Sequence, residues 1–170
     1  MPVNIEIKAR CADPTRVRQF LLEKNARSVG TDHQIDTYYR VPKGRLKLRQ
    51  GKIENALIHY DRPDQDGPKS SQVTLSPVAD GETLRNLLAN ALGVWAVVDK
   101  QREIYFIRNA KFHIDTVSGL GGFVEIEVID QDGSIGQEIL EQDCRMYMEA
   151  LGIQEQDLLS SSYSDMLGIS

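Results

Sequence analysis

Apolar and polar residues alternate strictly at the start of the chain. The odd-numbered positions from Val3 to Ala9 are apolar, and the even-numbered positions from Asn4 to Arg10 are polar or charged. This period of two is typical of a β-strand with one apolar face and one polar face. Similar alternating patterns with strong charges recur at 45–49, 100–102, 111–115 and 124–128. Because the charges in these five segments are sorted by sign, they indicate a shared polar interior.

The rest of the pattern predicts strands joined by hairpins, with helices between groups of strands. Helical spacing of apolar residues predicts helices from Asp13–Pro14 to before Gly30, at 81–92, at 136–151 and at 154–167. The predicted strands are 3–10, 34–41, 45–50, 56–62, 71–77, 95–107, 111–117 and 123–129. This order implies an antiparallel α+β fold with helices packed outside, and a charged inner face favours a closed β-barrel around a polar ligand.

Length and composition restrict the class of protein. A chain of 170 residues predicts one domain, spanning residues 1–170, and its 41% hydrophobic and 26% charged residues are typical of a globular protein. The net charge of −5 argues against a generic nucleic-acid binder. No apolar run is long enough to cross a bilayer, no signal sequence is visible, and Cys11 and Cys144 lack a metal-type spacing. We therefore expect a cytoplasmic protein without membrane or nucleic-acid partners, while its oligomeric state, a homodimer included, stays open.

Acidic residues gather at the end of the strand pattern. Glu125 and Glu127 lie on one face of a predicted strand, with Cα atoms about 6.6 to 6.8 Å apart. Taken alone, such a pair is typical of a solvated surface strand. Glu6 and Asp115 on neighbouring strands would complete a cluster of oxygen ligands, which suits Mg²⁺ or Mn²⁺ better than zinc. Beside inward-facing cations the metal interpretation is favoured, and these four carboxylates are the predicted metal ligands.

Basic residues on the predicted inner face would repel one another in a cavity. An anion with a charge of about −3 to −4 relieves this repulsion, and arginine offers paired donors to phosphate oxygens. Carboxylates, a divalent metal and many cations together suit phosphoryl transfer, so a small-molecule triphosphate is the expected ligand. No glycine-rich Walker loop and no nucleophilic triad is visible. The predicted phosphate-binding residues are Lys8, Arg10, Arg45, Lys47, Arg49, Arg62, Lys69, Lys100 and Arg102, of which Lys8, Lys47, Arg49, Lys100 and Arg102 are the predicted catalytic cations.

Eight short segments occur in an order that is informative as a set. They are 4–10 (NIEIKAR), 36–39 (DTYY), 44–49 (GRLKLR), 67–71 (GPKSS), 100–102 (KQR), 113–121 (HIDTVSGLG), 123–127 (FVEIE) and 162–167 (SYSDML). With them the chain resembles the CYTH family, also called triphosphate tunnel metalloenzymes, over nearly its whole length. The resemblance implies an eight-stranded antiparallel tunnel that binds triphosphates with Mg²⁺ or Mn²⁺. Its members include class IV adenylyl cyclases, thiamine triphosphatases and inorganic tripolyphosphatases.

One position departs from the pattern of that family. The family's opening motif is Glu-x-Glu-x-Lys, and this chain has Asn4 at the first acidic position. The amide still offers a carbonyl oxygen, but a neutral one, so a divalent ion would bind more weakly and a second metal site is in doubt. Alternatively, Asn4 lies at the strand entrance and ligates nothing.

The leading hypothesis is therefore a metal-dependent enzyme that acts on a triphosphate, with hydrolysis preferred. The alternatives are a class IV adenylyl cyclase that makes cyclic AMP from ATP, and a non-catalytic module that binds polyphosphate. Three interpretations concern residues outside the site: Asp36 and Tyr38 belong to the barrel wall, Lys111 reaches solvent, and Leu84 and Leu88 belong to the core.

Overall fold

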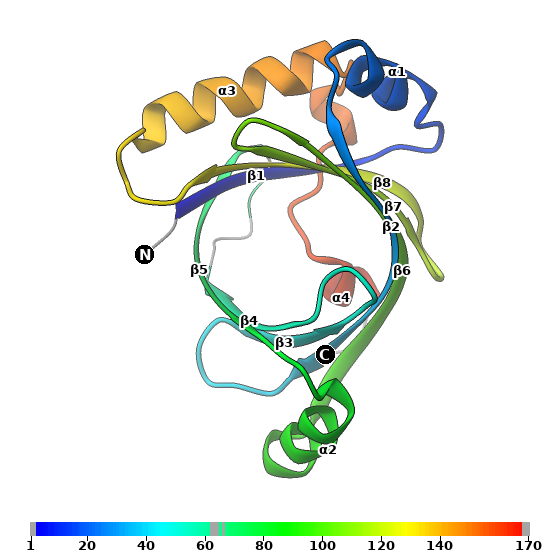
Figure 1. Cartoon of the computed structure of the whole chain (residues 1–170), viewed down its shortest axis with the longest axis vertical. Coiled ribbons are helices and arrows are strands. Elements are labelled where there is room, and N and C mark those ends of the chain that lie inside the picture. Colours follow the sequence, from blue (N-terminus) through cyan, green and yellow to red (C-terminus); the bar gives the residue numbers. More distant parts are fainter. Residues whose placement is uncertain (1–2, 62–64, 66, 168–170) are drawn as a thin grey trace.

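The chain folds into a closed antiparallel barrel, seen in the computed structural model, which describes residues 3–61, 65 and 67–167 (Figure 1). The strands follow the order β1-β5-β4-β3-β2-β6-β7-β8 around the ring. The prediction of a closed eight-stranded α+β barrel is therefore confirmed. The strands are β1 (Val3–Arg10), β2 (Arg27–Tyr39), β3 (Arg45–Gln50), β4 (Ala56–Asp61), β5 (Lys69–Pro77), β6 (Val94–Ile107), β7 (Ala110–Val117) and β8 (Gly121–Asp130).

Strand β1 closes the ring because it pairs with β5 on one side and with β8 on the other. Glu6 stands opposite Lys69 in β5 and opposite Glu127 in β8. Since successive side chains of a strand point to opposite faces, the even-numbered residues of β1 face the barrel interior and the odd-numbered ones face outward. Ile5 and Ile7 are nonetheless at most 1% exposed, because helices cover this outer face.

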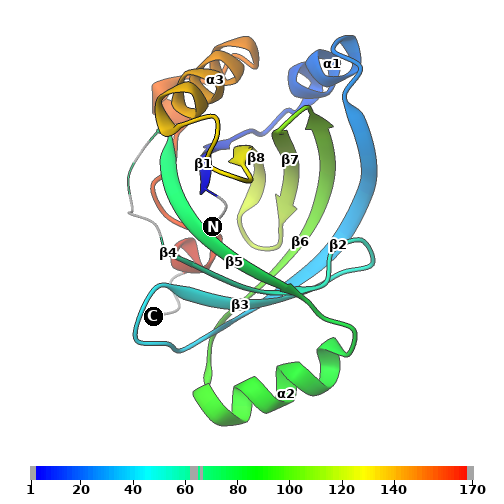
Figure 2. The same cartoon turned by 60° about the vertical axis from the view of Figure 1, so that its left-hand side comes forward.

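Helices pack around the barrel on two opposite sides (Figures 1 and 2). Helix α3 (Gln137–Ala150) lies across β1 and β8, with α1 (Thr15–Glu23) beside it, and α2 (Gly81–Leu92) lies on the far side. The short α4 (Tyr163–Met166) lies within the outline of the ring in Figure 1. Within the described residues, no helix combines the length and the apolar character needed to cross a membrane.

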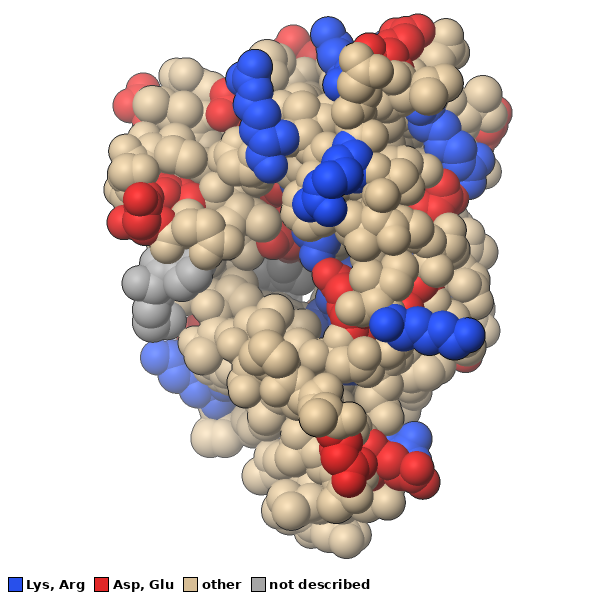
Figure 3. Space-filling view, in the orientation of Figure 1, with Lys and Arg blue, Asp and Glu red and all other residues tan. Residues whose placement is uncertain are grey.

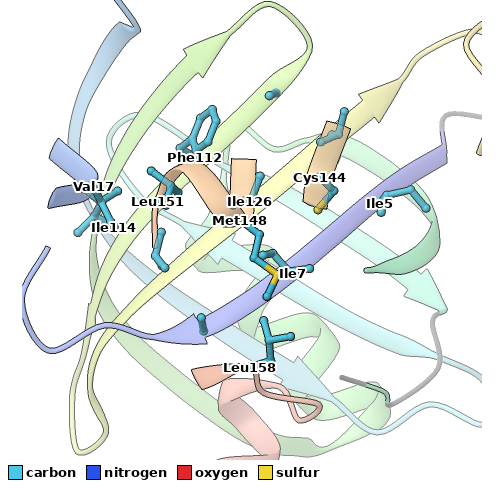
Figure 4. Packing of buried hydrophobic residues seen from close by; sticks show 14 of the residues in the cluster. Ile5, Ile7, Val17, Phe112, Ile114, Ile126, Cys144, Met148, Leu151 and Leu158 are labelled. Carbon is cyan, nitrogen blue, oxygen red and sulfur yellow. The ribbon is translucent and has the colours of Figure 1, made fainter. Parts of the chain in front are cut away.

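The larger of two buried apolar clusters lies between α1 and α3 and the outer faces of β1, β7 and β8 (Figure 4), and the smaller one includes Tyr38, Ile58 and Tyr163. Phe112 of β7 is 0% exposed, and its ring contacts Tyr147 of α3 edge-on, with centroids 5.1 Å apart, and Phe20 at 6.4 Å. The wall formed by β1, β7 and β8 therefore has an apolar layer on its outer side, under the helices, and the charged tunnel on its inner side.

Truncating Phe112 tests this apolar layer. We expect Phe112→Ala to lower the free energy of unfolding by about 3 to 5 kcal/mol, because it removes a buried ring and leaves a cavity. Denaturant titration followed by circular dichroism measures the change. Leu22→Ala is the control, since Leu22 is 79% exposed and its truncation should change stability little. A loss below about 1 kcal/mol for Phe112→Ala would contradict the packing described here.

Some predicted boundaries were wrong. Strand β2 begins at Arg27 and not at 34, because its first half pairs with the end of β6, far away in the sequence. The predicted final helix at 154–167 is a 3₁₀ turn (Glu155–Asp157), an extended segment and α4. That extended segment continues the barrel wall, where the Leu159 amide donates to the Lys8 carbonyl at 3.0 Å. Helix α2 has no buried residue, so Leu84 and Leu88 are only partly covered.

Candidate active site: a charged tunnel

The barrel encloses a cavity of about 330 Å³ whose wall combines many charged side chains with apolar and aromatic ones. Figure 3 looks down the barrel, and Lys and Arg atoms meet Asp and Glu atoms around the hollow at the centre of this face. One sector, from β4 and β5, is apolar and includes Ile58, Val73 and Leu75. The charged and polar side chains that line the cavity include Asn4, Glu6, Lys8, Lys47, Arg49, Glu54, Lys100, Arg102, Lys111, His113, Glu125, Glu127 and Tyr163.

Asp36 organises the basic side of the tunnel. Its carboxylate is fully buried and accepts hydrogen bonds from Arg49 Nε at 2.9 Å and Nη2 at 2.7 Å, and from Lys100 Nζ at 2.7 Å. Lys47 Nζ lies 3.4 Å from the same carboxylate. Burial opposes ionisation, yet the charges of Arg49, Lys100 and Lys47 hold the pKa of Asp36 well below its usual range. One carboxylate is thus shared by three cations, and the cluster has a surplus of positive charge.

Lys100 registers that surplus. Its side chain is 1% exposed, and burial, together with the positive charges of Arg102, Arg49 and Lys47, lowers its pKa well below the ordinary value despite the contact with Asp36. A group whose charged form is this costly gains from any further anion nearby. Lys100 would therefore gain from a further anion, whereas the charges of Asp36 and Glu54 outweigh burial at Arg49 and raise its pKa above the ordinary value.

Arg102 connects the basic side to the acidic side. It forms a paired contact with Asp115, with Nε–Oδ1 2.7 Å and Nη2–Oδ2 2.6 Å, and also contacts Glu125. The Tyr163 hydroxyl of α4 donates to Asp115 Oδ2 at 2.7 Å. Both oxygens of Asp115 are therefore engaged by Arg102 and Tyr163, and the cavity lining does not include this residue. Asp115 was predicted to be a metal ligand. In the structure its carboxylate instead pairs with Arg102, away from the cavity surface.

The acidic side consists of Glu6, Glu125 and Glu127 on the paired strands β1 and β8. Glu127 accepts a hydrogen bond from Asn4 Nδ2 at 2.9 Å. Burial first, and then the negative charges of Glu6 and Glu125, raise the pKa of Glu127 to about 7. Two buried atoms beside this group, Asn4 Oδ1 and His113 Nε2, have no hydrogen-bond partner among the described residues. Crowded carboxylates and an unused amide oxygen are donors that suit a hard divalent cation.

These residues fit a Mg²⁺ or Mn²⁺ ion that is bound partly by protein carboxylates and partly by the phosphate groups of a substrate. Within the described residues, no three His, Cys, Asp or Glu side chains are grouped closely enough to enclose a metal ion by themselves. Mg²⁺ usually keeps several waters and binds through one or two carboxylates together with substrate phosphates, so a complete protein cage is not required. Glu6 and Glu127 are the pair best placed for this, with Glu125 next to them.

The raised pKa of Glu127 leads to a pH-dependent prediction. In the metal-free protein Glu127 is largely protonated below about pH 7, and a metal ion requires the ionised form. We expect Mg²⁺ binding near pH 6 to release a proton, and Mg²⁺ affinity to rise up to about pH 8. Calorimetry in buffers with different ionisation enthalpies measures this release, and Glu127→Gln should abolish it. Proton-independent Mg²⁺ binding would contradict the prediction.

Raising this pKa also affects the stability of the metal-free fold. The ordinary glutamate pKa, near 4.3, applies to the unfolded chain, so between about pH 4.3 and 7 the folded protein binds more protons than the unfolded chain does. The contribution of Glu127 is therefore fully present below about pH 4.3 and is lost as the pH rises through 7.

Comparison with known proteins places this tunnel in a family. The CYTH domain model matches residues 3–163. The chain belongs to the CYTH family. A relative from Methanocaldococcus jannaschii, named as a candidate adenylate cyclase, is 25% identical and is matched over 98% of this chain and 99% of its own length.

Solved structures share the fold of this CYTH protein. A candidate adenylate cyclase from Vibrio parahaemolyticus superposes with a TM-score of 0.81 at 16% identity, covering 97% of each chain. A candidate adenylyl cyclase from Hippeastrum, described as having a dominant triphosphatase activity, superposes with a TM-score of 0.63 at 13% identity, covering 98% of this chain and 94% of its own. At these identities the likeness establishes the fold.

The CYTH tunnel gathers many of the predicted site residues and leaves others at its edge. Lys8 lies in the tunnel with Nζ 4.1 Å from the centre of the Tyr163 ring. Arg45 and Lys69 lie in a separate hollow of about 200 Å³ at one mouth, where Lys69 Nζ donates to the Ser160 carbonyl at 2.6 Å. Arg10 is exposed at the end of β1, with its guanidinium 5.3 Å from the centre of the Phe123 ring. Arg62, also predicted to bind phosphate, lies outside the described residues.

The sequence interpretation missed further tunnel residues of this CYTH protein. Lys111 was expected to reach solvent, but its side chain is 14% exposed, lines the tunnel and pairs with Glu54. Glu54 lies in the loop between β3 and β4 and had not been considered. A signal existed for Lys111, which shares the inward parity of His113 along β7, whereas loop residue Glu54 has no periodic pattern to reveal it.

Proposed function

We propose that this CYTH protein is a phosphohydrolase that acts on a triphosphate in its tunnel with the help of Mg²⁺ or Mn²⁺. The observation that carries the proposal is the shared carboxylate of Asp36. Three cations converge on it, so the cluster has positive charge to spare for an anion. The crowded Glu6 and Glu127 on β1 and β8 supply the complementary acidic side. A triphosphate with a bound divalent ion carries both kinds of charge that such a tunnel requires.

Each group of residues has a role in this proposal. Lys47, Arg49 and Lys100 hold phosphate oxygens and stabilise the charge that develops on the transferred phosphoryl group. Arg102, oriented by Asp115, extends this cationic surface toward the carboxylates. Glu6 and Glu127, with Glu125, would hold the metal ion, which supplies Lewis-acid stabilisation of phosphate oxygens when bound. Water then attacks the terminal phosphorus, the bond from this phosphorus to the bridging oxygen breaks, and the water proton passes to solvent. Orthophosphate and the remaining diphosphate part of the substrate are the expected products.

The apolar sector of the tunnel favours a second candidate activity. Ile58, Val73 and Leu75 offer no charge to a phosphate, so this sector suits the organic part of a substrate. In a class IV adenylyl cyclase the ribose 3′-hydroxyl of ATP would attack the α-phosphorus and release pyrophosphate. The name of the Methanocaldococcus relative agrees with this alternative, and the activity described for the Hippeastrum protein agrees with hydrolysis.

Product analysis separates these candidates. The protein is incubated with ATP and with tripolyphosphate, each with Mg²⁺ and with Mn²⁺, and the products are identified by chromatography. Orthophosphate supports the hydrolase and cyclic AMP supports the cyclase. Tight binding without turnover would instead favour a non-catalytic module. The feature that supports this alternative is the neutral Asn4 at the first acidic position of the family motif. If no triphosphate bound at all, the proposed function would be wrong.

A further inference from the structure

The loop between β3 and β4 is anchored from inside the protein by Asp32 of β2, and Figures 1 and 2 draw it beside that strand. The Asp32 carboxylate is 1% exposed and accepts hydrogen bonds from the backbone amides of Lys52 at 2.8 Å, Ile53 at 3.1 Å and Glu54 at 3.0 Å. Gly51 is also required, because an added Cβ would stand 2.5 Å from an Asp32 oxygen. The loop therefore has a defined conformation.

This anchored loop directs Glu54 into the tunnel. One Glu54 oxygen accepts from Gln34 Nε2 at 2.9 Å and from Arg49 Nη1 at 3.3 Å, and the other accepts from Lys111 Nζ. Arg49 is next to the last residue of β3, and Lys111 is the second residue of β7, so these contacts lie at one end of the barrel. Burial opposes ionisation of Glu54, but Lys111 and Arg49 lower its pKa, and the group is an anion at neutral pH.

Glu54 thus binds the cationic groups of Arg49 and Lys111, which a phosphate chain at this end of the tunnel would otherwise contact. Arg49 already bonds Asp36 and turns its remaining nitrogen, Nη1, to Glu54. The hollow at the other end is lined by the cations Arg45 and Lys69 together with the carboxylates of Asp61 and Asp165, and Arg45 Nη2 pairs with Asp165 at 3.3 Å. A phosphate chain that grew toward Glu54 would meet a fixed negative charge and lose its cationic partners.

We propose that Glu54 is a specificity-determining stopper, which closes this end of the tunnel to further phosphates and so limits the length of the phosphate chain. This inference rests on the proposed function, since it concerns the same tunnel. It assigns Asp32 a positioning role, because Asp32 holds the loop amide of Glu54 itself. A stopper of this kind discriminates by repulsion, which rejects the longer chain, as well as by attraction.

Binding of linear phosphates tests the stopper. Dissociation constants for tripolyphosphate and tetrapolyphosphate are measured by calorimetry without divalent ions, so that the result does not depend on turnover. We expect Glu54→Gln to raise the affinity for tetrapolyphosphate relative to tripolyphosphate by about tenfold or more, because it removes a charge next to the added phosphate. Asp32→Asn, which loosens the loop, should change this ratio in the same direction.

The control variant is Glu103→Gln, which breaks a surface ion pair with Arg18, and its affinity ratio should equal that of the wild type. An unchanged ratio in Glu54→Gln would overturn the stopper and leave the proposed function standing. A changed ratio without any turnover by the wild type would support the stopper and remove the hydrolase. If the wild type bound neither phosphate, either without divalent ions or with Mg²⁺, both proposals would fail.

Discussion

Replacing Glu127 with Gln is expected to abolish turnover of the triphosphate at saturating Mg²⁺ or Mn²⁺, with kcat lowered by about 10³-fold or more. The amide has the size of the carboxylate but no charge, so under the proposed function Glu6 would lose its partner in holding the metal ion. A bound metal contributes several kcal/mol of transition-state stabilisation, and each 1.4 kcal/mol changes the rate about tenfold. Steady-state kinetics at several metal concentrations measure the effect.

Folding of this variant offers an independent check. Glu127 is crowded by Glu6 and Glu125 in the metal-free protein, and a neutral amide at this position removes their mutual repulsion. The melting temperature of Glu127→Gln at about pH 8 should therefore not fall below that of the wild type. Arg49→Ala is the comparison on the basic side, and it should weaken triphosphate binding, raising KM more than it lowers kcat. Full activity of Glu127→Gln at saturating metal would show that the metal assignment is wrong.

Replacing Asp36 with Asn is expected to lower the free energy of unfolding by about 3 to 5 kcal/mol, because removing one partner of a buried ion cluster leaves its other charges uncompensated. Here those charges are Arg49, Lys100 and Lys47. Because the folded-state pKa of Asp36 is depressed, its contribution is present above the unfolded pKa, near 3.9, and is lost as the pH falls toward the folded value.

A polyanion should compensate for this substitution. Tripolyphosphate supplies negative charge to the same cations, so it should raise the melting temperature of Asp36→Asn more than that of the wild type. Thermal unfolding with and without tripolyphosphate measures both effects. Asp99→Asn is the matched control, because Asp99 pairs with His33 at the surface, where its side chain is 52% exposed. Equal stability of Asp36→Asn and the wild type would contradict the central role given to Asp36.

The sequence was most informative where one face of a strand is apolar and the other is charged. The bounds predicted for β1 and β3 agree with the structure, because apolar and polar residues alternate strictly along both strands. The first half of β2 was missed because its stability comes from pairing with the distant end of β6, which leaves no local signal. The prediction of a final helix was wrong for a similar reason, because a β-bridge to Ala9 holds the chain near Leu158 in an extended conformation.

The same distinction applies to the candidate site. Alternation along β3 and β6 was enough to predict that Lys47, Arg49, Lys100 and Arg102 share one cavity, and the structure brings them together. The alternation pattern could not reveal which carboxylate each of these cations pairs with. Asp115 became the partner of Arg102 through the register of β6 and β7, and this removes it from the tunnel surface.

Alternate residues of strand β1 contribute to two different parts of the protein, and this limits which sequence changes the strand can accept. Ile5 and Ile7 belong to the apolar layer, while Glu6 and Lys8 belong to the tunnel. Inserting a single residue upstream in this strand would exchange the two sets and place charge under α3 and hydrocarbon beside the substrate. Variation in β1 is therefore restricted to replacements that keep the length of the strand, and a library for engineering new substrates should draw its diversity from β4 and β5.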